Sequence, residues 1–161
     1  MNDRHFSSCE VVELGIQIEK NGRDFYSALA GSTRNARAAE IFKYLAGEEE
    51  KHIAVFREIF NTSCKYEPEG AYPEDYFSYM NTLASEHVFT QKDKGKELAQ
   101  NIESDIKAVE LSIKFEEESV AFYENMKKVI PAREEGTIDR LIKEEESHIK
   151  KLSDVKKILE S

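Results

Sequence analysis

Apolar residues recur every three or four positions along most of this chain, a spacing typical of amphipathic α-helices with one face in a core. The segments that carry this spacing are rich in Glu, Lys, Leu and Ala and poor in glycine and proline, which favours long helices. The pattern predicts four helices, over about 8–30, 33–61, 104–130 and 133–159. The dipeptide Asn21-Gly22 is typical of hairpin turns, but helical spacing continues on both sides, so the first helix is predicted to be continuous.

A less regular segment, residues 62–103, separates the first pair of helices from the second. It opens with Pro68 and Pro73 in a loop and then carries a predicted helix over about 74–88. Connections within each pair are short, which forces antiparallel neighbours, and about 40 residues are enough to return along helices of about 38 Å. The sequence therefore predicts an all-α fold in one domain, 1–161. This fold is a four-helix bundle with hairpins 8–61 and 104–159 and one long crossover, 62–103, between the second and third helices.

The two halves of the chain resemble each other. The run VELGIQIE, which ends at Glu19, recurs as VELSIKFE, which ends at Glu116. Each copy is followed by a Phe-Tyr pair, at Phe25-Tyr26 and Phe122-Tyr123. We interpret the chain as a duplicated helical hairpin.

Acidic residues and histidines interrupt the apolar stripes that should face the core. Between apolar turns, the second predicted helix carries Glu49 and His52 on its stripe, and the fourth carries Glu145 and His148. The stripes of the first and third helices each carry a single glutamate midway. The candidate site residues are Glu19, Glu49, His52, Glu116, Glu145 and His148. Neighbouring acids fall off these stripes and are predicted to face water: Glu48, Glu50, Glu117, Glu118, Glu144 and Glu146.

Four carboxylates at one level of a bundle would repel one another, and burying even one isolated carboxylate costs several kcal/mol. Two metal ions would remove this conflict, because the acids can supply terminal and bridging oxygens and each histidine one nitrogen. Glu49 and Glu145 are the predicted bridges. Mixed oxygen and nitrogen ligation favours iron or manganese over a zinc site with sulfur ligands. The alternative is a set of polar core residues that satisfy one another, since a lone Glu-x-x-His also arises by chance in a glutamate-rich chain.

Four further residues near the stripes are candidates for the same site. Tyr26 and Tyr123 are predicted as catalytic-site residues, because each lies two turns beyond the glutamate of its own helix and would donate a hydrogen bond to a ligand carboxylate. The alternative is that both are ordinary core tyrosines. Gly22 and Ser119 lie one turn beyond the same glutamates, and their small size would leave room for dioxygen or peroxide.

Composition limits the partners that this chain can have. Acidic residues outnumber basic ones by 32 to 23, and a phosphate-binding surface needs the opposite balance, so nucleic acid is not an expected partner. No stretch approaches the roughly 20 apolar residues that span a bilayer. No apolar secretory segment begins the sequence, so no membrane partner is expected and a cytoplasmic location is predicted. The two cysteines, Cys9 and Cys64, form no C-x-x-C pair, which excludes a four-cysteine metal site in these residues, and they are predicted to be thiols.

One Glu from each of two helices and Glu-x-x-His from each of the other two is the ligand pattern of ferritin-like di-metal carboxylate proteins. The ordered set in this chain resembles the rubrerythrin group of that superfamily, and the resemblance covers nearly the whole sequence. It implies a ferritin-like bundle with two iron ions, for which manganese or zinc would be substitutes. It also implies a homodimer or a larger assembly, and a non-haem di-iron oxidoreductase that reduces hydrogen peroxide or dioxygen in oxidative-stress defence.

Two departures from the pattern of that group bear on function. Typical rubrerythrins carry a four-cysteine rubredoxin domain that relays electrons, and with only two cysteines here an electron-donor protein acting in trans is expected. They also have a further ligand glutamate where this chain has Ser119, which bears on peroxidase activity. Two alternative functions remain: a ferritin-like iron-binding or storage protein with ferroxidase activity, and a helical interaction module with a vestigial polar stripe.

Overall fold

The computed structural model describes residues 8–63, 79, 82–83, 89, 91 and 93–161. These residues form helices and connecting turns, and the described part of the chain contains no strand. The elements are α1 Ser8–Ser32, α2 Ala36–Ser63, α4 Lys94–Gln100, α5 Asp105–Met126, the 3-10 turn η2 Ala132–Glu134, and α6 Glu135–Glu160. The all-α prediction is confirmed.

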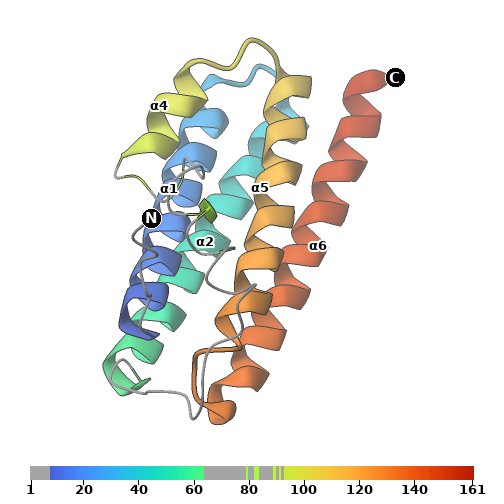
Figure 1. Ribbon diagram of the computed structural model, residues 1–161. Coiled ribbons are helices and arrows are strands. Elements are labelled where there is room, and N and C mark those ends of the chain that lie inside the picture. The colour runs from blue at the N-terminus through green and yellow to red at the C-terminus, as the bar shows by residue number, and fades with distance from the viewer. Residues whose placement is uncertain (1–7, 64–78, 80–81, 84–88, 90, 92) are drawn as a thin grey trace.

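Four long helices make a bundle of two hairpins. α1 packs along α2 and α5 packs along α6, while α1 also touches α5 and α2 touches α6 (Figure 1). The α1–α2 turn and the α4–α5 connection lie at one end of the bundle, and the α5–α6 turn lies at the other. This arrangement brings the middle turns of all four long helices to the same level.

Local capping sets where two of the helices begin. The Ser104 hydroxyl accepts a hydrogen bond from the Lys107 backbone N–H at 3.2 Å, so α5 begins at Asp105, as the sequence predicts. The second helix begins three residues later than predicted, at Ala36, because Asn35 Oδ1 accepts from Ala38 N at 3.0 Å. Thr33 donates instead to Asp105 across the bundle end, at 2.7 Å.

The crossover contains a helix that the sequence analysis did not predict. α4 packs against α1, and its start is fixed by the side chain of Asn21, whose Oδ1 accepts from Gly95 N at 3.0 Å. The Asn21 amide also donates to the carbonyls of Phe89 and Gln91, at 2.7 and 2.6 Å. One buried asparagine therefore ties three points of the crossover to the middle of α1. The helix predicted over 74–88 falls mostly outside the described residues.

Gly95 should be intolerant of a side chain. A Cβ at this position would overlap the backbone carbonyl of Asn21, so α4 would have to move away from α1. We expect Gly95→Ala to lower the free energy of unfolding by about 1–3 kcal/mol, as overpacking does in cores. The matched control is Gly136→Ala, because a Cβ there meets nothing within 4 Å. Urea denaturation of both variants checks this, and equal stabilities would show that α4 does not depend on the close approach.

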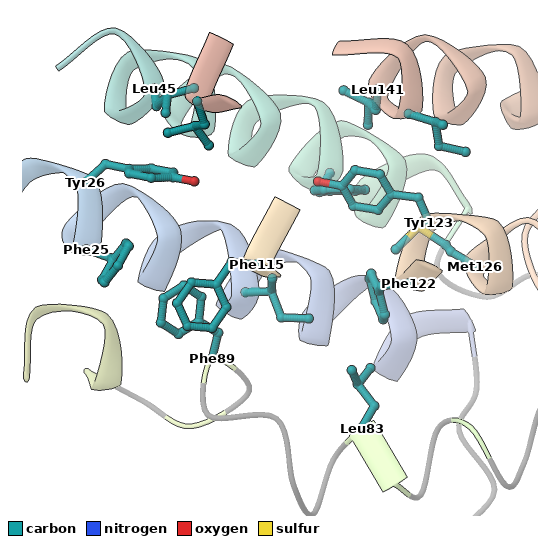
Figure 2. Packing of buried hydrophobic residues seen from close by; sticks show 14 of the residues in the cluster. Phe25, Tyr26, Leu45, Leu83, Phe89, Phe115, Phe122, Tyr123, Met126 and Leu141 are labelled. Atoms are coloured by element: carbon teal, nitrogen blue, oxygen red, sulfur yellow. The ribbon is translucent and has the colours of Figure 1, made fainter. Parts of the chain in front are cut away.

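The bundle interior combines aliphatic layers with an aromatic cluster beneath the crossover. Phe89 stacks on Phe115 with ring centroids 3.9 Å apart, and Phe25 meets both rings edge-on (Figure 2). Edge-to-face and offset aromatic pairs add stability beyond their buried area. The cluster holds the crossover onto α1 and α5.

The structure also bears on the state of the cysteines and on membrane-spanning segments. Cys9, at the start of α1, is disulfide-bonded, so the prediction of a thiol is wrong at this position. That prediction rested on the missing export signal, which says nothing about which atoms the fold brings together. Cys64 lies outside the described residues. None of the helices in the described residues is both long and apolar enough to cross a membrane.

Candidate metal centre

The six candidate residues meet inside the bundle at the level where its four long helices pass one another. Each side chain is almost fully withdrawn from solvent. α1 supplies one glutamate, α5 supplies one, and α2 and α6 each supply a glutamate and a histidine. These residues are Glu19, Glu116, Glu49, His52, Glu145 and His148. Helical spacing explains the pairing, because residues three apart lie on the same face of a helix.

Glu145 lies between the two histidines. Its Oε1 is 2.8 Å from His52 Nδ1, and its Oε2 is 3.4 Å from His148 Nδ1. The histidine rings stack at a centroid separation of 5.9 Å, with 20° between their planes. One carboxylate therefore presents a different oxygen to each imidazole.

The remaining glutamates extend this centre on both sides. Glu19 Oε2 lies 3.5 Å from His52 Nδ1, and Glu116 Oε2 lies 3.7 Å from His148 Nδ1. The ligand atoms fall into two groups, within each of which all atoms lie inside 4.8 Å of one another. Both groups contain Glu49 and Glu145, whereas Glu19 belongs to one and Glu116 to the other. The geometry thus offers two adjacent cation positions with two shared carboxylates.

Several of the oxygen and nitrogen atoms that could ligate a metal have no hydrogen-bond partner. Among the described residues, every buried side-chain oxygen or nitrogen that lacks a partner belongs to this cluster. These atoms are both carboxylate oxygens of Glu19, Oε2 of Glu116, Oε2 of Glu145, and Nδ1 of His52 and His148. Leaving a buried polar atom unpaired costs about 1–3 kcal/mol, and more for a charged group. The donor set therefore fits bound cations better than the alternative of a self-satisfied polar core.

The pKa values of the metal-free centre also reflect the cost of burying several carboxylates together. Burial raises the pKa of Glu19 to about 7 and the pKa of Glu49 to about 8. Burial acts to raise the pKa of Glu145 as well, but the adjacent histidines outweigh it and that pKa is lowered. For His52, burial opposes the charged form, yet Glu145 and Glu19 raise its pKa. In the metal-free protein, bound protons therefore neutralise part of the negative charge that bound cations would otherwise neutralise.

Comparison with known proteins agrees with this geometry. A sequence model of the rubrerythrin family matches residues 10–156. The chain belongs to the rubrerythrin family. No curated protein shows a significant match in sequence.

Among solved structures, this rubrerythrin-family chain is similar to a putative ferritin-like diiron-carboxylate protein from Thermotoga maritima. The TM-score is 0.67 with 20% sequence identity, over 96% of this chain and 97% of the other. The predicted ferritin-like fold is confirmed by this likeness, which at such low identity is evidence of the fold alone. The crossover accordingly links the two hairpins of a ferritin-like bundle.

The two tyrosines of this rubrerythrin-family site differ in how they contact it. The Tyr26 hydroxyl donates to Glu116 Oε1 at 2.6 Å, while the Tyr123 hydroxyl lies 3.5 Å from Glu145 Oε1, at the outer limit of a hydrogen bond. Figure 2 shows the two hydroxyls pointing toward each other across the bundle. Burial raises the pKa of Tyr26 well above its ordinary value, so this phenol keeps its proton. Tyr26 thus leaves Glu116 Oε2 as the oxygen directed at His148.

Replacing the Tyr26 hydroxyl should weaken metal binding. We expect Tyr26→Phe to lower the affinity for ferrous iron by about 10-fold or more, because partners that orient metal ligands contribute 10- to 100-fold. The control is Tyr123→Phe, which removes the longer contact and should have a smaller effect. Anaerobic competition with a coloured iron chelator measures both affinities, and equal losses would contradict the short Tyr26 contact as the cause.

The structure corrects the expectation that the neighbouring acids all face water. Glu144 Oε2 accepts from His52 Nε2 at 2.8 Å, although its side chain is 39% exposed. The Glu48 side chain is only 14% exposed and pairs with Lys51 at 3.1 Å. A carboxylate on the far nitrogen of a ligand imidazole fixes the tautomer and ring orientation. Glu144 therefore directs His52 Nδ1 into the centre from the neighbouring helix.

The two small residues lie near the centre to different degrees. A Cβ added to Gly22 would meet the Glu49 carboxylate carbon at 3.5 Å, an ordinary contact distance, so the glycine leaves a small space beside that side chain. Ser119 is partly buried on α5. A path for dioxygen or peroxide past either residue stays a prediction.

Proposed function

We propose that this protein is a di-iron oxidoreductase that reduces hydrogen peroxide, or dioxygen, in oxidative-stress defence. The observation that carries the proposal is the position of Glu145, whose two oxygens face the Nδ1 atoms of two buried imidazoles, at 2.8 Å from His52 and 3.4 Å from His148. Together with membership of the rubrerythrin family, this donor set supports two bound iron ions. Manganese or zinc would be substitutes in the same ligands.

In this proposal the six side chains divide into terminal and bridging ligands. Glu19 and His52 would hold one ion, Glu116 and His148 the other, and Glu49 and Glu145 would bridge them. The iron ions would supply the redox chemistry and Lewis acidity. The chain holds the carboxylates and both Nδ1 atoms in one buried cluster, keeps a proton on Tyr26, and excludes bulk water. Tyr26 and Tyr123 are proposed to act on the reaction by orienting carboxylates.

The electron donor, the oligomeric state and the cellular location are also part of the proposal. Reduction of one peroxide to two waters consumes two electrons and two protons, and a separate donor protein would supply the electrons. We propose a homodimer in the cytoplasm, without nucleic acid or membrane partners. The ferritin-like alternative, iron storage with ferroxidase activity, uses the same ligands and predicts a larger hollow assembly.

The test is a single-turnover reaction. Protein loaded anaerobically with two ferrous ions per chain is mixed with peroxide, and peroxide consumption and iron oxidation are followed together. One peroxide consumed per two ferrous ions oxidised, without iron release, supports the proposal. Oxidation only with dioxygen and excess iron, accompanied by a mineral core in a large assembly, would favour storage. A protein that retains no iron would exclude both functions.

A further inference from the structure

The two cation positions differ in what lies behind their histidines. The first position is that of Glu19 and His52, and the second position is that of Glu116 and His148. His52 Nε2 donates to Glu144 Oε2 at 2.8 Å, so an acid of α6 supports a histidine of α2. The ion pairs of His148 with the described acids all involve Nδ1, and its ring meets that of Tyr44 with planes at 89°. A carboxylate on the far nitrogen orients a ligand imidazole and raises its basicity, and the described residues provide one for His52 alone.

The internal repeat shows why the two sides differ. When the Glu-x-x-His motifs of α2 and α6 are superposed, Glu48 corresponds to Glu144 and Lys51 corresponds to Ser147. Lys51 lies one turn beyond Glu48 and pairs with it at 3.1 Å, which holds this acid along its own helix. Ser147 carries no charge, so Glu144 has no such partner at the equivalent position of α6. Glu144 reaches across to His52 instead.

Two other charged groups lie near this contact. Arg140 Nε is 3.8 Å from Oε1 of Glu144, whereas the hydrogen bond to His52 uses Oε2. Glu48 has an oxygen within 4.8 Å of ligand atoms of both His52 and Glu144, but its hydrogen bond is to Lys51. Glu48 therefore acts on this side of the centre through its charge, and Glu144 is the acid bonded to the imidazole.

The terminal glutamates differ in the same direction. Neither oxygen of Glu19 has a hydrogen-bond partner, so both are available to an ion at the first position. Glu116 has one such oxygen, because Tyr26 donates to the other at 2.6 Å. A hydrogen bond to a carboxylate stabilises its charge and makes it a weaker base. The first position thus has more available oxygens and a better supported histidine than the second.

We infer that the two cation positions are inequivalent: the first position fills first and empties last, and Glu144 is the positioning residue that produces the difference. The inference rests on the proposed function, because it concerns the two ions of that centre. Glu144 itself is not a ligand, and it acts by holding the His52 ring with Nδ1 toward Glu19 and Glu145. Partners of this kind contribute about 10- to 100-fold to metal affinity.

The experiment resolves the two binding steps. Ferrous iron is added anaerobically to the metal-free protein in competition with a coloured chelator, which gives the affinity of each step. Glu19→Ala and Glu116→Ala assign the steps, because each removes a ligand from one position only. The test variants are Glu144→Ala and Glu144→Gln, of which the second keeps an oxygen that accepts from an imidazole N–H. Glu48→Gln removes the nearby charge without that bond, and Glu146→Gln removes an exposed acid of the same helix.

We expect the wild-type protein to bind its two ions with dissociation constants that differ by about 10-fold or more. Glu19→Ala should lose the tight step and Glu116→Ala the weak one. Glu144→Ala should weaken the tight step by about 10-fold or more and leave the weak step unchanged, while Glu144→Gln should lose less. Glu48→Gln should have a smaller effect than either, and Glu146→Gln none. Circular dichroism verifies that every variant is folded.

Three results would overturn the inference. The first is a wild-type protein whose two ions bind with equal affinity. The second is loss of the tight step in Glu116→Ala rather than in Glu19→Ala. The third is an equal weakening of both steps in Glu144→Ala, since a residue that only stabilises the bundle would affect both positions alike.

Failure of the proposed function would be seen in a different measurement. The titration contains no oxidant, so it examines the ligands alone. Two unequal binding steps in a protein that consumes no peroxide would refute the oxidoreductase and leave the inequivalence standing. Normal peroxide consumption in a protein with two equal steps would refute only the inequivalence.

Discussion

Glu145→Ala is expected to abolish binding of both iron ions, whereas Glu19→Ala should leave one ion bound. Glu145 directs an oxygen at each histidine and belongs to both ligand groups, while Glu19 belongs to one. Loss of this shared carboxylate also removes the acid that lies nearest to Nδ1 of both His52 and His148. We expect affinity to fall by more than about 100-fold in Glu145→Ala, because partners outside the ligand shell already contribute up to that factor. Anaerobic titration with ferrous iron, followed by metal analysis, gives the stoichiometry.

Two comparisons make this prediction specific. Glu146→Ala removes the next glutamate along α6, which is exposed, and should retain two ions. Replacing both Glu49 and His52 with alanine should abolish metal binding, as Glu145→Ala does. Retention of two ions by Glu145→Ala would show that the centre is misplaced, and equal losses in Glu19→Ala and Glu145→Ala would contradict the shared position of Glu145.

The centre could be predicted from sequence because its residues violate a strong rule. A glutamate on the core stripe of an amphipathic helix is costly, and four glutamates and two histidines at matched positions on four such stripes have few physical explanations. Leu45 and Leu141 lie on the same stripes, one turn before Glu49 and Glu145, and both are fully buried. Periodicity shows on which face of a helix a residue lies. At this site, knowing that face was enough to predict which residues meet in the core.

Contacts between helices were harder to predict. Glu144 lies off its own stripe, yet it reaches His52 because α6 crosses α2 at that level. The available signal was the repeated Glu-Glu-x-x-His in both halves, in which the acid before each site glutamate recurs. Which histidine such an acid would meet depends on how the helices cross, and helical spacing does not encode this.

The crossover was the least predictable part. α4 is only Lys94–Gln100, too short for a periodic pattern, and it follows Asp93 in a left-handed backbone conformation. Its position depends on the Asn21 side chain. In the sequence, Asn21 stands out only as part of a dipeptide that is typical of hairpin turns. A buried asparagine within a helix indicates a polar partner from elsewhere in the chain. The identity of that partner requires the tertiary structure.

The stability of the metal-free protein is expected to fall as the pH rises from about 5 to about 8. Glu19 and Glu49 have folded-state pKa values of about 7 and about 8, both above the ordinary value of 4.5. In this window the folded state binds more protons than the unfolded state, so raising the pH favours unfolding. The raised pKa of His52 acts in the same direction above pH 6.5. The combined loss is on the order of a few kcal/mol.

Iron should reverse the sign of this dependence. Metal ligation requires deprotonated carboxylates and neutral imidazoles, so affinity rises with pH over the range in which the metal-free protein weakens. Bound metal adds about 4 kcal/mol of stability at a thousandfold excess over its dissociation constant. Urea denaturation across this pH range, with chelator or with anaerobic ferrous iron, measures both slopes. Glu19→Gln should flatten the metal-free slope, because it removes one of the protons that folding retains. A metal-free protein that gains stability toward pH 8 would contradict the buried acids as the cause.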